Sequence, residues 1–343
     1  GRDTIVYGKI PVDRLAEGTV QYFLEDGTPL KEGKYRTTDL SKSEQGFYVT
    51  ANGLKSDVFK VSIREPFAED AYETITYPVV FHLIQDKTKV ELGQGVGADI
   101  VNYAFNTIYN CFARTAAFSP NGADTKIRFR LAEYDPNGRK MEEKGINRYS
   151  LSTSDLNNLN PEKIKNNPKI CWDYKRYLNI WIVENMGNSV STPHYILNTA
   201  DLNQIQGVSF EQLSLEEIEK QEYSLTDIGL IYGARDFAIE DVGYPTQMGK
   251  FFGLLDTENQ KEDYCEDTFA YNTYKEPWNT ALEGSNSRLK ISTDGLIFYS
   301  VNIMDASSYK NTISMDQVKR IRTITDNCPH RWAWKSDWAF TGK

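Results

Sequence analysis

The sequence predicts a protein of mixed α+β class, in which a small all-β domain precedes a larger domain of strands and helices. Three observations support this prediction. The chain has 343 residues, more than the ~100–200 of one ordinary domain. Short β-rich runs separated by turn sequences fill residues 1–66. After residue 74, β-rich runs are instead separated by segments whose apolar residues recur at helical spacing.

Composition and charge exclude several classes of function. The chain is 40% hydrophobic and 25% charged, so it has enough apolar side chain for a folded core. Its formal net charge of −9 at pH 7 argues against binding nucleic acid or an anionic membrane, because both require a basic surface. The longest apolar runs are strand-sized and fall short of the ~20 residues that span a bilayer. We therefore expect no nucleic-acid partner and no membrane span.

Residues 1–66 are expected to form a small β-sandwich of immunoglobulin-like type. Their β-rich runs include the two-residue turn sequences Asp26-Gly27 and Asn52-Gly53. They contain no cluster of titratable residues, so a structural or docking role is expected rather than a catalytic one. We place the linker at residues 67–76 and the second domain at residues 77–343.

The larger domain is predicted to open with a buried strand at Thr74–Ile84. A helix within Val96–Thr115 follows, since its apolar residues lie on one helical face. Capping-box sequences at Ser214 and Ser314 indicate the starts of two later helices. Further β-rich runs occur at residues 126–134, 176–184 and 227–237.

Several short motifs follow one another in a fixed order between residues 74 and 328. They include Asp135-Pro-Asn-Gly138, Gly145-Ile-Asn-Arg148, Leu178-Asn-Ile-Trp181 and Asn302-Ile-Met-Asp305. Together with the opening strand TYPVVFHLI, the segment GYPTQMGKFFGLLDT and the acidic segment DYCEDT, this order resembles the pappalysin-like metzincins, which are zinc-dependent endopeptidases. The chain looks most like lipoprotein members of that family from Bacteroides-type bacteria. The resemblance implies a metzincin-like domain, with a twisted mixed sheet and helices.

The resemblance also locates the segment that would bind zinc. When Gly249 and Gly253 are matched to the glycines of the family's zinc motif, the three ligand positions hold Thr246, Lys250 and Asp256. Zinc sites of this kind need imidazoles four residues apart on one helix. Threonine is a poor ligand and an ammonium group repels a dication, so the resemblance implies a site that has lost zinc.

Two further positions complete the comparison with the zinc motif. Gln247 stands where the general base would be, and its amide cannot accept the proton of a metal-bound water. Met304 matches the methionine beneath the metal. In the resembled fold the second and third ligands converge because the helix ends near the glycine, here Gly253. We therefore predict that Lys250 and Asp256 form an ion pair where the metal would have been.

The implied present function is binding of a peptide or protein ligand without cleavage. An extended ligand would add to an edge strand of the cleft, which we place at residues 228–237 with Ile228, Leu230 and Tyr232 as contacts, together with Lys250 and Asp256. Two alternatives stay open. One is an active metal-dependent endopeptidase with a non-standard ligand set, and the other is a glycan-binding surface protein that uses the tryptophan-rich tail at residues 330–340.

The acidic segment at residues 263–268 matches a region where some relatives bind calcium. Asp263, Asp267 and Thr268 are therefore candidate calcium ligands, although three oxygen donors fall short of the six to eight that calcium takes. No zinc is expected. Four cysteines, at 111, 171, 265 and 328, are compatible with up to two disulfides or with free thiols. We favour Cys265 with Cys328, because both lie beyond the zinc-helix segment.

The chain begins Gly1-Arg2-Asp3 without a methionine, which is typical of a processed product. With the family resemblance, this leads us to expect an exported protein. It would be a cell-surface or periplasmic lipoprotein, anchored by a lipid outside the chain seen here, or a secreted protein.

Overall fold

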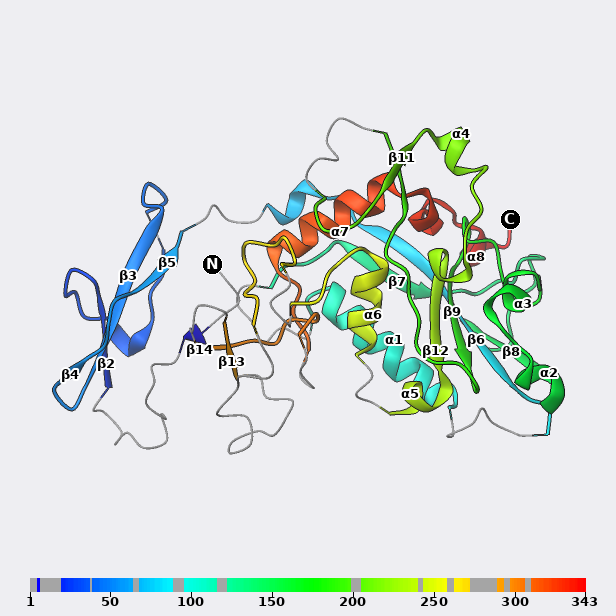
Figure 1. The fold of residues 1–343 in the computed structure, drawn as a ribbon, viewed down its shortest axis with the longest axis horizontal. Helices are drawn as coiled ribbons and strands as arrows, with labels where there is room; N and C mark the ends of the chain where they lie inside the picture. Colours follow the sequence, from blue (N-terminus) through cyan, green and yellow to red (C-terminus); the bar gives the residue numbers. More distant parts are fainter. Residues whose placement is uncertain are drawn as a thin grey trace.

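The computed structural model describes residues 5–6, 20–37, 39–63, 68–88, 96–115, 122–198, 205–239, 243–257, 262–271, 289–292, 297–305 and 310–343. Strands and helices alternate along the larger part of the chain, which confirms the predicted α+β class (Figure 1). No helix in these ranges is long and apolar enough to cross a membrane.

The centre of the protein is a five-stranded sheet in which each paired set of strands is parallel. Its order is β12-β9-β6-β7, and β8 pairs with the second half of β6 beyond the end of β7. All but one residue of β6 are buried, because both faces of the sheet are covered. The strands are β6 (Ile75–Asp86), β7 (Ile127–Leu131), β8 (Ile146–Leu151), β9 (Leu178–Val183) and β12 (Gly229–Gly233).

Helices cover both faces of this sheet. One face forms the main core with α1 (Ala98–Phe112), α6 (Tyr244–Phe251) and α7 (Met315–Asn327), and α5 (Ala234–Ala238) joins it through Phe237. The other face packs Trp181 and Ile231 against the short helices α2 (Thr153–Asn157) and α3 (Pro161–Lys165). The expected helix at Val96–Thr115 and the capping box at Ser314 are both confirmed.

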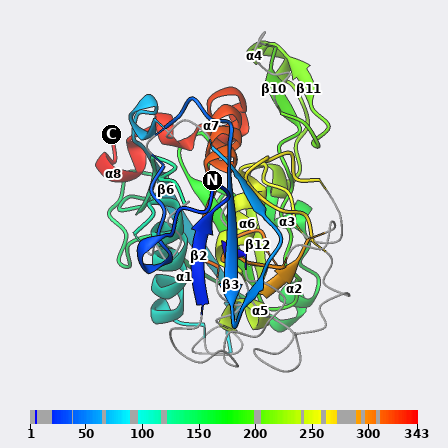
Figure 2. The ribbon, with the colours of Figure 1, turned by 90° about the vertical axis from the view of Figure 1, so that its left-hand side faces the viewer.

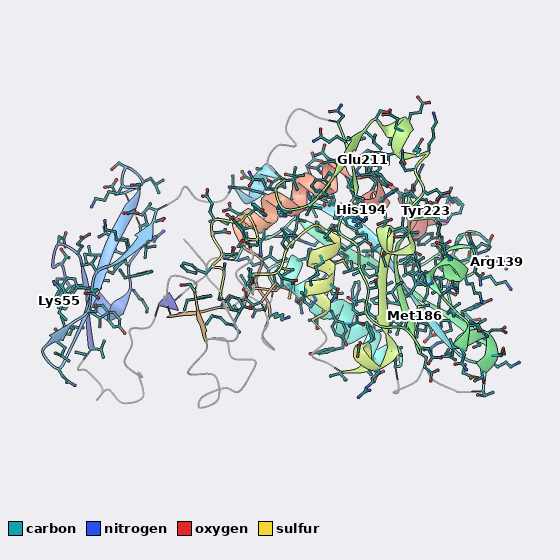
Figure 3. All side chains as sticks on the ribbon, in the orientation of Figure 1. Lys55, Arg139, Met186, His194, Glu211 and Tyr223 are labelled. Carbon is teal, nitrogen blue, oxygen red and sulfur yellow. The ribbon has the colours of Figure 1, made fainter. Side chains whose placement is uncertain are left out.

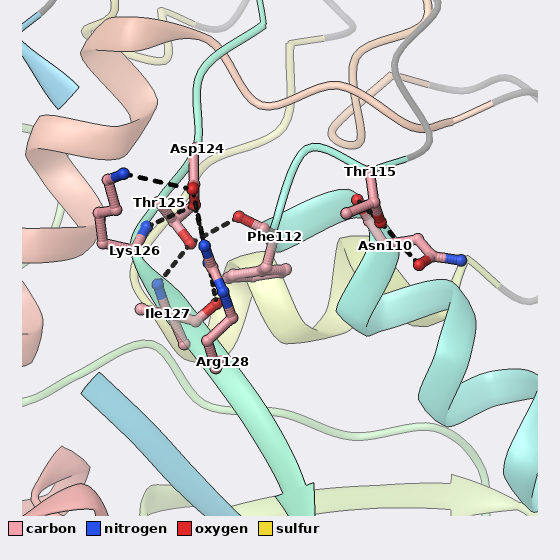
Figure 4. Close-up of polar contacts among 8 residues, drawn as sticks. All are labelled: Asn110, Phe112, Thr115, Asp124, Thr125, Lys126, Ile127 and Arg128. Carbon is pink, nitrogen blue, oxygen red and sulfur yellow. Dashed lines mark hydrogen bonds and ion pairs between the residues drawn. The ribbon is translucent and has the colours of Figure 1, made fainter. Parts of the chain in front are cut away.

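Polar contacts fix the junction between α1 and β7 (Figure 4). Thr125 Oγ1 donates to the carbonyl of Phe112, the last residue of α1, at 2.8 Å. The Asp124 carboxylate accepts bonds from Arg128 Nη1 at 2.8 Å and from the backbone N–H of Lys126 at 2.8 Å. Burial alone would raise the pKa of Asp124, but these bonds outweigh it and lower the pKa. They also hold Lys126 in the left-handed conformation, with φ of 57°.

The N-terminal region contains one antiparallel four-stranded sheet, drawn in blue at one end of the long axis (Figure 1). The second sheet of the expected sandwich does not occur within the described residues up to 63. Instead, β1 (Ile5–Val6) pairs with β14 (Ile297–Tyr299), which in turn pairs with β13 (Leu289–Ile291). The proposed domain boundaries therefore stay a prediction. The sheet consists of β2 (Val20–Leu24), β3 (Glu44–Ala51), β4 (Leu54–Lys55) and β5 (Phe59–Ser62).

Two peripheral features complete the fold. An arm made of β10 (Tyr195–Leu197), the parallel strand β11 (Glu211–Leu213) and α4 (Leu215–Ile218) rises away from the sheet (Figure 2). The tryptophan-rich tail ends in α8 (Trp338–Thr341) and packs on the body, because Trp338 Nε1 donates to the carbonyl of Asp135 at 3.2 Å. Single 3-10 turns occur at Lys31–Gly33, Glu69–Ala71, Leu225–Asp227, Pro329–Arg331 and Ala333–Lys335.

Candidate functional site

The candidate site is built on α6 and on the turn that ends it. The backbone N–H of Gly253 donates to the carbonyl of Lys250 at 2.8 Å, and that of Leu254 donates to Gly249 at 2.9 Å, which is a Schellman motif. Gly253 adopts φ of +85°, and a Cβ there would lie 2.0 Å from Ile324 of α7. Only glycine meets both requirements, so the helix ends at the glycine that the family resemblance indicated, and the chain turns back.

This turn brings Lys250 and Asp256 together. Lys250 Nζ lies 2.9 Å from Asp256 Oδ2, and the two side chains keep 30% and 39% of their surface exposed. The predicted ion pair between these two residues is therefore confirmed. It has the length of a charge-assisted hydrogen bond and reaches solvent, so both ionised forms are hydrated on one side.

A second ammonium group, that of Lys310, contacts Thr246, the residue expected at the first ligand position. Thr246 lies one helical turn before Lys250 and is buried. Its hydroxyl donates to the carbonyl of Ile303 at 2.5 Å and accepts a bond from Lys310 Nζ at 3.1 Å. Gln247, at the expected base position, is half-buried on the same helix. Sequence analysis did not identify Lys310, because it lies 64 residues from Thr246 and outside the matched residues Asn302–Asp305.

Met304 lies directly against α6. Its side chain is buried, and a Cβ on Gly249 would meet Met304 Sδ at 2.9 Å. The turn that carries Met304 is held by Asn302, whose side-chain oxygen accepts the backbone N–H of Met304 at 2.9 Å. Behind it, Thr257 Oγ1 donates to the buried carboxyl of Asp305 at 2.5 Å. Burial raises the pKa of Asp305, and this hydrogen bond offsets only part of that increase.

The expected edge strand needs correction. The side chains of Ile228, Leu230 and Tyr232 are 1–2% exposed and belong to the core, so they cannot contact a ligand from solvent. The backbone N–H and carbonyl of Ile231 exchange hydrogen bonds of 2.9 Å with Ser189, which runs antiparallel to β12. A preceding part of the chain therefore covers β12, and the outer edge belongs to the segment around Ser189. A wholly buried apolar strand such as β12 looks the same in sequence whether or not a neighbouring segment covers its edge.

Asp263 and Asp267, two of the candidate calcium ligands, accept hydrogen bonds from other groups of the protein. Asp267 accepts bonds from Ser314 Oγ at 2.6 Å and from the backbone N–H of Asp316 at 3.0 Å, so it caps α7. Asp263 accepts Thr268 Oγ1 at 2.6 Å, and burial raises the pKa of Asp263 to about 6. Within the described ranges, no three His, Cys, Asp or Glu residues are grouped so that they could hold a metal ion.

The favoured disulfide is wrong, because all four cysteines are free thiols. Cys265 lies in the loop that caps the start of α7, whereas Cys328 directly follows its last residue. A helix of 13 residues separates the two ends by about 20 Å, while a disulfide needs Cα atoms within about 7 Å.

The histidines occupy two kinds of environment. His330 is buried among the rings of Tyr174, Tyr195 and Tyr223, and burial with the charge of Arg331 lowers its pKa to about 4. His194, labelled in Figure 3, is half exposed with Nε2 at 3.4 Å from a carboxylate oxygen of Asp227. Neither lies in a group that could bind a metal among the described residues.

Among known proteins, the chain is similar only at the level of solved structures. No protein-family model and no curated protein matches the chain. It is similar to mature mirolysin of Tannerella forsythia in complex with a cleaved peptide, at 18% identity and a TM-score of 0.47, over 78% of this chain and 97% of that one. A structure of mirolysin with a compound is similar at 18% identity and a TM-score of 0.49, over 79% and 99%. A promirolysin mutant of Tannerella forsythia is similar at 18% identity and a TM-score of 0.46, over 78% of this chain and 85% of that one.

Proposed function

We propose that this protein binds an extended peptide or protein segment and does not cut it, as a pseudoprotease that has lost zinc. The observation that carries the proposal is the ion pair of 2.9 Å between Lys250 and Asp256. It occupies the positions that the resembled motif uses for two metal ligands. An ammonium group there supplies the positive charge that Asp256 would otherwise receive from a metal, and it repels a dication.

The remaining positions support the same conclusion. The Thr246 hydroxyl donates its hydrogen to the carbonyl of Ile303 and accepts a hydrogen bond from Lys310 Nζ. A second cation therefore lies beside the position of the first ligand. Gln247 has no proton-accepting group that could activate water. Hydrolysis by a metal-bound water would need both features that these residues lack.

The segment around Ser189 is the proposed binding edge. Ser189 uses its backbone N–H and carbonyl to hold β12, so residues on either side of it direct theirs away from the sheet. Among the described residues, no hydrogen bond involves the backbone of Val190. A peptide strand could pair there without displacing a backbone hydrogen bond of Val190. Export and attachment as a lipoprotein belong to the same proposal and rest on the family resemblance.

Metal content and binding of an unfolded protein together test the proposal. We expect purified protein to contain no stoichiometric zinc, to bind fluorescein-labelled β-casein in anisotropy titrations, and to leave it uncut after prolonged incubation. Val190→Pro should weaken binding by removing an outward N–H, whereas Val190→Ala should not. One equivalent of zinc with chelator-sensitive cleavage would establish the endopeptidase alternative instead.

Restoring the motif tests the assignment of positions. The combined substitution Thr246→His, Gln247→Glu, Lys250→His and Asp256→His should create zinc affinity, measured by calorimetry, if these positions face one ion. A folded quadruple variant without zinc affinity would contradict the assignment. The glycan alternative has less support, because the tail contacts the body through Trp338 and Ala339.

A further inference from the structure

We propose that Tyr264 is a specificity-determining residue of the peptide site and that its ring receives an apolar or aromatic side chain of the ligand. This inference rests on the proposed function. Tyr264 lies in the acidic loop at residues 262–268, where the family resemblance suggested a cation site. The residue is 43% exposed, although the residues on both sides of it are buried.

The backbone of Tyr264 adopts a conformation that tyrosine rarely takes. Its φ is +56°, in the left-handed region that disfavours side chains larger than those of glycine, asparagine and aspartate. Bulky residues persist in that conformation only where the surrounding structure imposes it, and such positions concentrate at functional sites.

The neighbours of Tyr264 show what imposes this conformation. On one side, Asp263 is 7% exposed and its carboxylate binds Thr268 Oγ1 and the backbone N–H of Cys265. On the other side, the Cys265 side chain is 6% exposed. Two residues anchored inward leave the side chain between them directed outward. The loop therefore presents Tyr264 to solvent.

The ring lies beside the chain segment that leads into Asp256. A Cβ on Gly207 would lie 2.2 Å from the Tyr264 ring and 2.6 Å from a methyl group of Leu255, so ring and methyl group are neighbours. Leu255 directly precedes Asp256, the partner of Lys250. Gly207 has φ of +80° and no side chain, which leaves room for the ring to lie on its backbone. An exposed aromatic face, an adjacent aliphatic side chain and a polar ion pair together suit an apolar ligand residue within an extended peptide.

A pair of synthetic peptides separates this inference from the proposed function. Both are acetylated, amidated decapeptides of Ser, Thr and Gly, and one carries a central Phe where the other carries Ser. We expect the wild-type protein to bind β-casein and to prefer the Phe peptide by about tenfold. Absence of binding to casein and to both peptides would overturn the proposed function. Binding of casein or of both peptides without preference for Phe would overturn only the role of Tyr264.

Variants at Tyr264 complete the test. Tyr264→Asn keeps a residue that tolerates the left-handed conformation, so the melting temperature should stay within about 2 °C while the preference for Phe disappears. Tyr264→Gly serves the same purpose if the Asn variant does not fold, and Tyr264→Phe should keep the preference. Tyr103→Asn, which removes another exposed ring on α1, is the matched control and should change neither binding nor preference. A Tyr264→Asn variant that melts early but keeps the preference would show a merely structural role.

Discussion

Two polar clusters of this protein, one around His82 and one around Lys250, behave in opposite ways. His82 lies in the middle of β6 with no exposed surface. Its Nε2 lies 2.9 Å from Asn179 Oδ1, and its Nδ1 lies 2.9 Å from Asn147 Nδ2. Burial lowers its pKa to about 4, against the hydrogen bond to Asn179, so the ring is neutral. Lys250 and Asp256 are charged and reach solvent.

The difference shows which polar groups maintain the fold and which can serve a ligand. A buried neutral network is satisfied entirely by protein partners, so any change in it costs stability. A half-exposed ion pair contributes little to stability, because water already hydrates both charges. Selection on binding can therefore alter the second cluster with little effect on folding.

The largest effect is expected for Arg331, a buried cation that joins three segments of the body. Its Nε donates to the carbonyl of Phe251 at 2.7 Å, Nη2 donates to Ser191 at 3.3 Å, and Nη1 donates to Asp227. Arg331→Met should lower the free energy of unfolding by about 3–5 kcal/mol, because two buried carbonyl groups and one partly buried carbonyl group lose their donor. Urea unfolding measures it, with the half-exposed Arg176→Met as a control expected below about 1 kcal/mol. A similar loss in both variants would contradict the contrast.

His82 should make stability depend on pH. An unfolded histidine takes up its proton near pH 6.5, whereas the folded His82 resists protonation until about pH 4. Between these values the unfolded chain binds more protons, so stability falls as the pH falls, by roughly 3 kcal/mol in total. His330 also contributes a loss of stability as the pH falls, because its pKa is lowered to about 4. Asp263, with its pKa raised to about 6, contributes a gain in stability as the pH falls.

The contribution of His82 is therefore the difference between wild type and His82→Gln. Urea unfolding at pH 7, 6, 5 and 4.5 should give a shallower pH dependence for the variant. Parallel curves for the two proteins would mean that His82 does not titrate as its burial requires.

The smallest effect is expected at the ion pair. Lys250→Met should change the free energy of unfolding by at most about 1 kcal/mol, because both side chains are partly hydrated. Asp256→Asn should give a comparable value. A loss above about 3 kcal/mol in either variant would show that the pair maintains the fold, and the contrast between the two clusters would fail.

The sequence by itself determined the local features of the fold. Apolar spacing identified β6 and α1, and the capping boxes marked the starts of α4 and α7. These features depend on residues close together in the chain, so the local pattern is sufficient to predict them. The convergence of Lys250 and Asp256 followed from the family resemblance, which placed the end of this helix near Gly253.

Tertiary structure decided the contacts between distant segments. That Ser189 covers β12, that Asp267 caps α7, and that Cys265 and Cys328 lie at opposite ends of that helix could not be predicted from spacing. Each depends on which surfaces meet after collapse, and an apolar strand or an acidic turn has the same local pattern with many partners. The position of the Tyr264 ring belongs to this second group, since Gly207 and Leu255, which lie beside it, come from other parts of the chain.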